Sequence, residues 1–204
     1  FVQEANDFYF PPLIGTYLRI LRIVVFLLTM FITPVWFLLV KDPARTQAGL
    51  EFLAIDSDYS VPLLVQLLLA EFIVDLLKLA SLNTPDVFSN SFSMLGALVL
   101  GDFAVQAHWL VPEVLVYMAF VAIANYAQHS YEMGYATKLC RILLLILVWL
   151  FDLWGFLAGV AGMLTLMATV KPLVGKGYLY PLCPFDKKAL RALLIRKPIS
   201  RENT

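Results

Sequence analysis

The sequence predicts an all-α protein: a polytopic bundle of transmembrane helices. Hydrophobic residues make up 61% of the 204 residues and charged residues only 15%, and the mean hydropathy is strongly positive. A soluble protein of this composition would expose large apolar patches to water. Long apolar runs recur, and about twenty such residues cross a hydrocarbon core of ~30 Å. We expect about four spanning helices, plus a charged amphipathic or re-entrant helix and a basic C-terminal interfacial helix.

The chain divides into three expected regions. Residues 1–19 read as an interfacial lead-in, because aromatic side chains and a Pro-Pro pair precede Arg19 and Arg22. Residues 20–170 form the transmembrane helical domain, and residues 171–204 a basic cytoplasmic tail. The chain opens without an initiating Met or a signal-peptide pattern, so we expect it to be the membrane part of a longer protein.

The first spanning helix is expected over residues 20–40, an almost purely apolar run. Pro34 should kink it, because a proline inside a helix removes a backbone donor. Trp36 is expected near the far membrane interface. Residues 41–60 are polar enough to form a loop.

The segment 61–80 is apolar but carries Glu71, Asp75 and Lys78 at a spacing that places them on one helix face. Two interpretations are open. The charged stripe faces water while the leucine face packs on the bundle, as in an amphipathic or re-entrant helix. Alternatively, Glu71 and Asp75 line an ion pathway or pair with a neighbouring subunit.

Residues 94–141 predict two apolar helices joined by a short break at 109–112, with one span over about 92–110 and the next over about 113–128. Polar residues lie within these helices. In the first span Asp102, Gln106 and Trp109 share a face, and in the second Asn125, Gln128 and Glu132 do so. Pore lining and hydrogen bonding between helices are equally compatible with them, and both require these side chains to point away from lipid. Gly96 and Gly101 are expected to allow close helix packing.

Residues 141–170 form an apolar run of about 45 Å if wholly helical, which is longer than a membrane needs. We expect one long, tilted or kinked span that Asp152 interrupts, and two short re-entrant halves are the open alternative. Gly155, Gly159 and Gly162 provide small residues for close helix contact, or they mark a bend.

The tail predicts a short amphipathic helix on the cytoplasmic membrane surface. Its basic residues face anionic lipid: Lys187, Lys188, Arg191, Arg196 and Lys197. A cytoplasmic tail and a cytoplasmic Arg19/Arg22 end require an even number of spans, which favours four. Lys138 and Arg141 would then lie outside, against the positive-inside trend.

No enzymatic motif is present. His108, His129, Cys140 and Cys183 have no spacing typical of a metal site or a nucleophile–base pair, and we expect free thiols and no cofactor. A net charge of zero gives no reason to expect nucleic acid. The residues alone support a channel, a transporter subunit or an assembly scaffold.

Several segments resemble, in order, the membrane region of the A subunits of bacterial spore germinant receptors, the GerA family. They are DFYFPPLIGTYLRILR, AEFIVDLLKLA followed by TP, GALVLGDFAVQA with VPEVLVYMAFVAIA, and YLYPLCPFDKKALRALLIRKP. The resemblance covers essentially the whole chain. Within the family, VPEVLVYMA and YLYPLCPF are most similar to the stage V sporulation protein AF branch. Family members carry a large soluble region before this membrane part.

The resemblance implies a subunit of an oligomeric cation channel in the spore inner membrane, which releases monovalent ions during germination. The implied partners are further copies of the chain, other germination membrane proteins, lipids and monovalent cations. A permease-like transporter subunit or a non-conducting assembly scaffold is the alternative.

The paired acids of the family correspond to Glu71 and Asp75, and its basic partner to Lys78. A family glycine corresponds to Gly101, and Asp102 and Gln106 occupy the two polar places with acid and amide exchanged. His129 and Gly177 replace family prolines, which implies altered bends. The candidates for the ion path are Glu71, Asp75, Asp102, Gln106 and Asn125.

Overall fold

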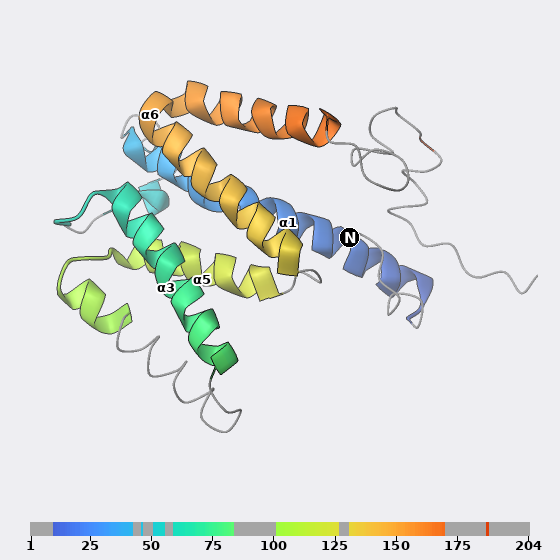
Figure 1. The fold of residues 1–204 in the computed structure, drawn as a ribbon, viewed down its shortest axis with the longest axis horizontal. Coiled ribbons are helices and arrows are strands. Elements are labelled where there is room, and N and C mark those ends of the chain that lie inside the picture. Colours follow the sequence, from blue (N-terminus) through green and yellow to red (C-terminus); the bar gives the residue numbers. More distant parts are fainter. Residues whose placement is uncertain are drawn as a thin grey trace, which may run out of the picture.

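A computed structural model describes residues 10–42, 46, 51–55, 59–83, 101–126, 131–169 and 187. Within these residues the chain is helical and contains no strand. The elements are α1 (Pro12–Lys41), the short 3₁₀ helix η2 (Glu51–Leu53), α3 (Leu63–Asn83), α5 (Pro112–Tyr126) and α6 (Tyr131–Thr169), together with a helical segment over residues 101–106 (Figure 1).

Helix α1 starts earlier than the predicted first span and takes in part of the lead-in. Pro12 occupies its first turn, where a missing N–H costs nothing. The helix has 30 residues, so it is about 45 Å long. Arg19, expected at the membrane surface, lies within this helix and is buried. Pro34 lies inside the helix, as the sequence predicted.

Helix α6 is divided at Asp152, where φ is 52° and ψ is −129°. Such a sparsely populated backbone conformation costs a non-glycine residue roughly 1–3 kcal/mol. The first leg (residues 131–151) and the second leg (residues 153–169) therefore fold toward each other, as Figure 1 shows. The predicted kink is thus a sharp turn rather than a gentle bend in one long span.

The two legs of α6 pack closely at glycines of the second leg. A Cβ added to Gly155 would overlap the backbone carbonyl of Leu147, and one added to Gly159 would lie 2.5 Å from the Leu144 side chain. Within the part of the chain that the structure describes, a Cβ on Gly162 would meet nothing within 4 Å. The absence of side chains at Gly155 and Gly159 is what lets the second leg return along the first.

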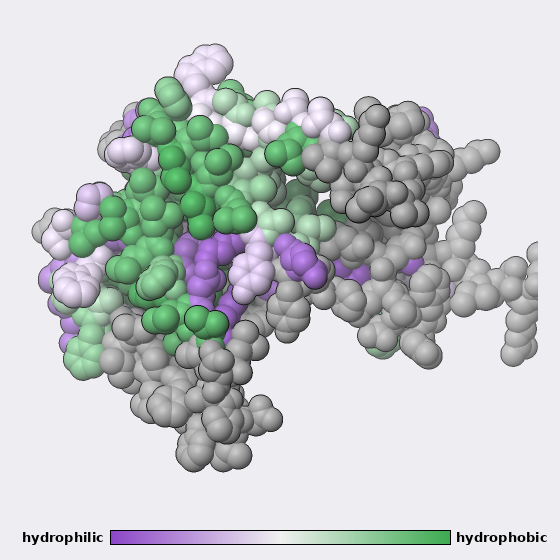
Figure 2. Space-filling view, in the orientation of Figure 1, coloured by the Kyte–Doolittle hydropathy of each residue, from purple (hydrophilic) through white to green (hydrophobic). Residues whose placement is uncertain are grey.

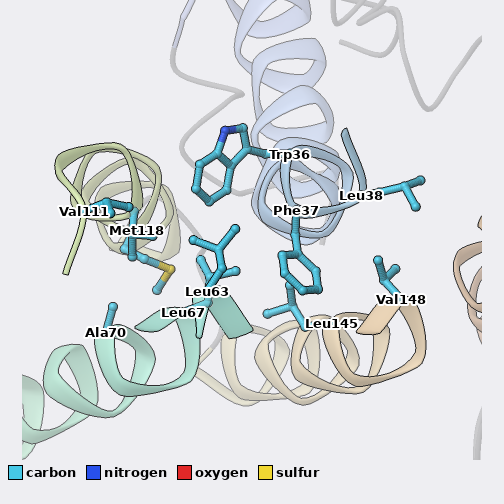
Figure 3. Close-up of a cluster of buried hydrophobic side chains, with 11 residues drawn as sticks. Trp36, Phe37, Leu38, Leu63, Leu67, Ala70, Val111, Met118, Leu145 and Val148 are labelled. Atoms are coloured by element: carbon cyan, nitrogen blue, oxygen red, sulfur yellow. The ribbon is translucent and has the colours of Figure 1, made fainter. Parts of the chain in front are cut away.

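The four long helices meet in one hydrophobic cluster (Figure 3). Trp36 of α1 lies against Tyr117 of α5, with ring centroids 4.7 Å apart, and its indole N–H donates to the Leu53 carbonyl at 3.1 Å. The buried members of the cluster are Trp36, Phe37, Leu38, Leu63, Leu67, Ala70, Val111, Val114, Met118, Leu145 and Val148. This cluster fixes the end of α1 and the start of α3 against the start of α5 and the first leg of α6.

The predicted break before residue 112 is present, and side chains from α3 and its approach hold it. His108 has a φ of 57°, and its carbonyl accepts hydrogen bonds from the backbone and side chain of Ser60. Gln66 of α3 is fully buried. Its carbonyl oxygen accepts from the Val111 amide at 2.8 Å, and its amide donates to the Val61 carbonyl at 2.8 Å. Gln66 thereby satisfies a backbone donor at the start of α5.

Much of the apolar surface of the longest helices is open. In the described part of the chain, α1 and residues 132–169 of α6 are long and apolar enough to cross a membrane. Only 33% and 28% of their most apolar stretches are buried inside the molecule. The core helix of a soluble protein is mostly buried, so this exposure favours a membrane environment.

Candidate functional site

The acidic stripe of α3 faces the first leg of α6 in the same chain. Glu71 is only 3% exposed, so the interpretation in which the whole stripe faces water is wrong for this residue. Its position on the inner face of α3 follows from the periodicity that the sequence showed. The basic side chains that meet Glu71 and Asp75 come from α6, about seventy residues later in the chain.

Arg141 is the centre of this contact. It is fully buried, and its Nε donates to Oε1 of Glu71 at 2.5 Å while Nη2 forms an ion pair with the same carboxylate. Nη1 donates to the backbone carbonyl of Thr29 in α1 at 2.8 Å. The planar guanidinium has several donors in fixed directions, so one side chain joins three helices.

The contact with α1 lies one turn before Pro34. A proline inside a helix lacks the N–H that would bond the carbonyl four residues earlier, and its ring pushes that turn away. The Thr29 hydroxyl donates to the Val25 carbonyl at 2.6 Å, a bond of the kind that often bends a helix. Arg141 thus reaches a main-chain oxygen close to the residue at which the sequence predicts a kink.

A second pair lies one turn along. Lys138 forms an ion pair and hydrogen bond with Asp75, and its Nζ is 4.0 Å from Oε2 of Glu71. Both Lys138 and Asp75 are partly exposed, in contrast to Glu71 and Arg141. Because residue 71 meets 141 and residue 75 meets 138, α3 and the first leg of α6 run antiparallel at this contact.

We name these four residues, Glu71, Asp75, Lys138 and Arg141, the charge cluster. It contains two acids and two bases, so its formal charges cancel. Removing one partner of a buried ion pair leaves a charge without compensation and typically costs about 3–5 kcal/mol. The cluster thus fixes α3 to α6 and, through Arg141, to α1.

The two bases of the cluster were not among the site residues predicted from the sequence. With four spans, Lys138 and Arg141 were expected to lie outside, against the positive-inside trend. Both lie within α6 and bind acids of α3, so they are not loop charges of the kind on which that trend rests. The sequence did contain a signal for this contact. Lys138 and Arg141 are three residues apart and Glu71 and Asp75 are four apart, so each pair lies on one face of its helix and each base can meet one acid.

The surface around the charge cluster contains both hydrophilic and hydrophobic side chains. Figure 2 shows hydrophilic side chains gathered in the middle of a largely hydrophobic face, over the region where α3 and α6 run in Figure 1. Described residues of this region include the partly exposed Asp75, Lys78 and Lys138. The family resemblance made Lys78 the basic partner of the acids, and the structure adds two further bases, because Arg141 and Lys138 bond to Glu71 and Asp75.

Asp102 and Gln106 form a separate polar pair. The Gln106 amide donates to Oδ2 of Asp102 at 3.0 Å, and both side chains are exposed on the helical segment 101–106. Trp109, expected on the same helix face, lies beyond this segment in the turn that follows. Among the described residues, a Cβ on Gly101 would meet the Leu115 side chain at 4.0 Å.

The remaining predicted residues are described in part. Asn125 is half-buried near the end of α5, and its Oδ1 makes no hydrogen bond within the described part of the chain. Of the basic tail residues only Lys187 is described, and it is exposed. Outside the described residues lie the other basic tail residues, Lys188, Arg191, Arg196 and Lys197, and also Gly96, His129 and Cys183. Cys140 is a half-buried free thiol in α6.

The described residues contain no group of three or more His, Cys, Asp or Glu side chains that could hold a metal ion. The arrangement can do two things chemically. The charge cluster can hold three helices in register, and its partly exposed edge can interact with ions or water in an otherwise apolar setting.

A second charged contact lies at the turn of α6. Lys41, the last residue of α1, forms an ion pair with Asp152 in which Nζ is 2.6 Å from Oδ1. Its Nζ also donates to the carbonyls of Trp149 at 2.8 Å and Val148 at 3.4 Å. A cation at the C-terminal end of a helix satisfies carbonyls that lack intrahelical donors. Lys41 therefore caps the first leg of α6 and holds its turn against α1.

Comparison with known proteins places this chain among spore germination proteins. The family model described as Bacillus/Clostridium GerA spore germination protein matches residues 1–204. Stage V sporulation protein AF of Bacillus subtilis is 33% identical over 96% of this chain and 39% of its own length, and spore germination protein KA of the same organism is 28% identical over 97% and 37%. Spore germination protein A1 is 22% identical over 98% and 42%.

The chain therefore spans about two fifths of the length of these curated relatives. No solved structure matches it. The predicted resemblance is confirmed by a family match over residues 1–204, together with a relative that is 33% identical over 96% of this chain. The chain belongs to the GerA family of spore germination proteins.

Proposed function

We propose that this chain is the membrane region of a subunit of an oligomeric channel. The channel conducts monovalent cations across the inner membrane of the bacterial spore during germination. Family membership supplies germination as the setting. The observation that carries the proposal is the hydrophilic area at the partly exposed edge of the charge cluster, set within a hydrophobic face (Figure 2).

Charged groups within membrane segments are costly when they contact lipid, and they generally face protein or water. Asp75 and Lys138 are partly exposed, on the face where α3 passes α6. When several copies surround an axis, such a face can border a water-filled path without contacting lipid. This is the reason for preferring an oligomer to a monomer.

The proposed path divides the acidic candidates by role. Glu71 is bound by Arg141, so its charge is compensated and its part is to position α3. Asp75 is also paired with a base, Lys138, but this pair is partly exposed and can border the path. Asp102 is exposed and hydrogen-bonded to the neutral Gln106, so it is the carboxylate that attracts cations, while Gln106 and Asn125 supply neutral oxygens. Other germination membrane proteins and anionic lipids are the proposed partners.

The test is potassium efflux from liposomes that contain the full-length protein. Asp75→Asn and the pair Asp102→Leu and Gln106→Leu should each reduce efflux several-fold. Leu139→Ala, at an exposed apolar position one residue from Lys138, is the matched control and should leave efflux unchanged. All variants are first checked for equal insertion and equal assembly by size in mild detergent and in nanodiscs.

Three outcomes would contradict the proposal. A monomeric particle in both detergent and nanodiscs excludes an oligomeric pore. Saturable uptake of a labelled solute, in place of flux that stays linear, indicates the permease-like alternative. Absence of efflux from assembled protein, alone and after co-reconstitution with germination partners, leaves the scaffold.

A further inference from the structure

The turn of α6 carries a group of exposed aromatic side chains. Trp149, Phe151 and Trp154 are 51%, 62% and 78% exposed, and they lie on both sides of Asp152. Asp152 is itself charged and paired with Lys41. We call these five residues the α6 tip. Large exposed aromatics beside charged groups are typical of the membrane–water interface, where the rings contact the headgroup region.

The α6 tip and the C-terminal end of α1 must lie at the same membrane face. Lys41 ends α1 and binds Asp152 and the carbonyls at the end of the first leg of α6. Further down the same pair of helices, Arg141 binds the Thr29 carbonyl. The two contacts show that α1 and the first leg run parallel, so residue 131 lies toward the end at which α1 begins.

We propose that the α6 tip is a lipid-interface anchor on the membrane face opposite to Arg19 and Arg22, and that both legs of α6 cross the bilayer as a helical hairpin. The contact partner is the headgroup layer of the membrane. This inference does not depend on the proposed channel function.

The lengths of the legs fit two crossings. The first leg, residues 131–151, is about 31 Å long, and the second leg, residues 153–169, is about 25 Å long. Counted in residues, both legs fall within the roughly 17–25 that usually span a membrane. The second leg contains no charged residue. Gly155 and Gly159 hold it close to the first leg, so it returns beside a helix that already crosses.

The hairpin also removes the conflict in the sequence-based topology. The start of α6 and the end of the second leg, which precedes the basic tail, both come to the side of Arg19 and Arg22. This distribution agrees with the positive-inside trend if that side is cytoplasmic, and it no longer places Lys138 and Arg141 on the opposite side. With one long span instead, the end of α6 would lie opposite to its start.

Cysteine accessibility tests the crossings. In full-length protein with Cys140→Ser and Cys183→Ser, single cysteines are placed at Phe151, Glu132 and Thr169. Right-side-out and inside-out vesicles are then treated with a membrane-impermeant maleimide. The expected result is that Phe151→Cys reacts from one side and both Glu132→Cys and Thr169→Cys react from the other. Reaction of Thr169→Cys from the same side as Phe151→Cys would overturn the hairpin, as would no reaction of Phe151→Cys from either side.

Fluorescence quenching tests the depth of the tip without disturbing the backbone. The emission that disappears in Trp149→Phe/Trp154→Phe is assigned to the tip, and its quenching is measured in bilayers of brominated lipids. Bromines near the headgroups should quench it at least twofold more than bromines near the chain ends. The reverse order would place these rings at mid-membrane and overturn the anchor.

Discussion

Arg141 and Glu71 are bound to each other inside the helix bundle, with Nε 2.5 Å from Oε1 and neither side chain open to solvent. The two residues lie seventy positions apart and on different helices. The same arginine holds the Thr29 carbonyl of a third helix, so the pair couples α1, α3 and α6.

Removing either charge should therefore destabilise the protein strongly. Glu71→Gln leaves Arg141 buried with its charge uncompensated, at an expected cost of about 3–5 kcal/mol. Arg141→Met removes the hydrogen-bonded partner of the buried Glu71 carboxylate and should also destabilise the protein, but by less, because Lys138 Nζ remains 4.0 Å from Oε2 of Glu71. The free energy of unfolding is measured for full-length protein in mixed micelles by titration with a denaturing detergent, followed by circular dichroism.

The double variant Glu71→Leu/Arg141→Leu is the internal control. It removes both charges at once, so its loss should be clearly smaller than the sum of the single losses. Additive losses would mean that the two residues act independently, contrary to the structure.

Substitutions of Asp152 should change the free energy of unfolding according to how well the new residue adopts a positive φ, rather than according to its charge. The positive φ at this position suits Asn, is less favourable for Ala and is worst for a β-branched residue. We expect the unfolding free energy to fall in the order Asn, Ala, Val, with Asp152→Val losing at least about 2 kcal/mol. The control is Leu150→Val, which places the same β-branched residue in regular helix. It should lower the free energy of unfolding by well under half as much as Asp152→Val does. Equal losses at the two positions would show that residue 152 adopts ordinary helical geometry.

The glycines of the second leg give a prediction with a matched pair. Gly155→Ala places a methyl group against the Leu147 carbonyl and should destabilise the fold by about 1–3 kcal/mol. Gly162→Ala meets nothing within 4 Å and should be neutral or stabilise by up to ~1 kcal/mol, since alanine favours helix. Gly159→Ala should fall between them, because the Leu144 side chain can move. Thermal unfolding of the three variants measures this order of stability. If Gly155→Ala stabilised the protein, the two legs would not be closely packed at Gly155.

Gln66 should control the start of α5. Gln66→Leu removes the acceptor of the Val111 amide and the donor to the Val61 carbonyl, and unpaired buried groups cost about 1–3 kcal/mol each. Hydrogen–deuterium exchange of the peptide around residues 107–116 should become markedly faster. Gln106→Leu, at an exposed position, serves as the control and should leave the unfolding free energy nearly unchanged. Unaltered exchange in Gln66→Leu would mean that the bonds of Gln66 do not hold this turn.

Local sequence features predicted several elements well. The break before residue 112 follows from a proline that suits the first turn of a helix and hinders what precedes it. The spacing of Glu71, Asp75 and Lys78 correctly placed them on one face of a helix. Asp152 marked the interruption of the longest apolar run. Each of these is a property of residues near one another in the chain.

The composition and periodicity of this sequence determined by themselves that the described chain is helical and apolar enough for a membrane, and its motifs determined the family. Only the tertiary structure decided that Glu71 meets Arg141, that Gln66 bonds to the start of α5, and that Lys41 holds the turn at Asp152. Periodicity reveals which face of a helix is polar, but not which distant helix covers it. That choice depends on how the helices cross, and the crossing is set by the packing of the whole bundle.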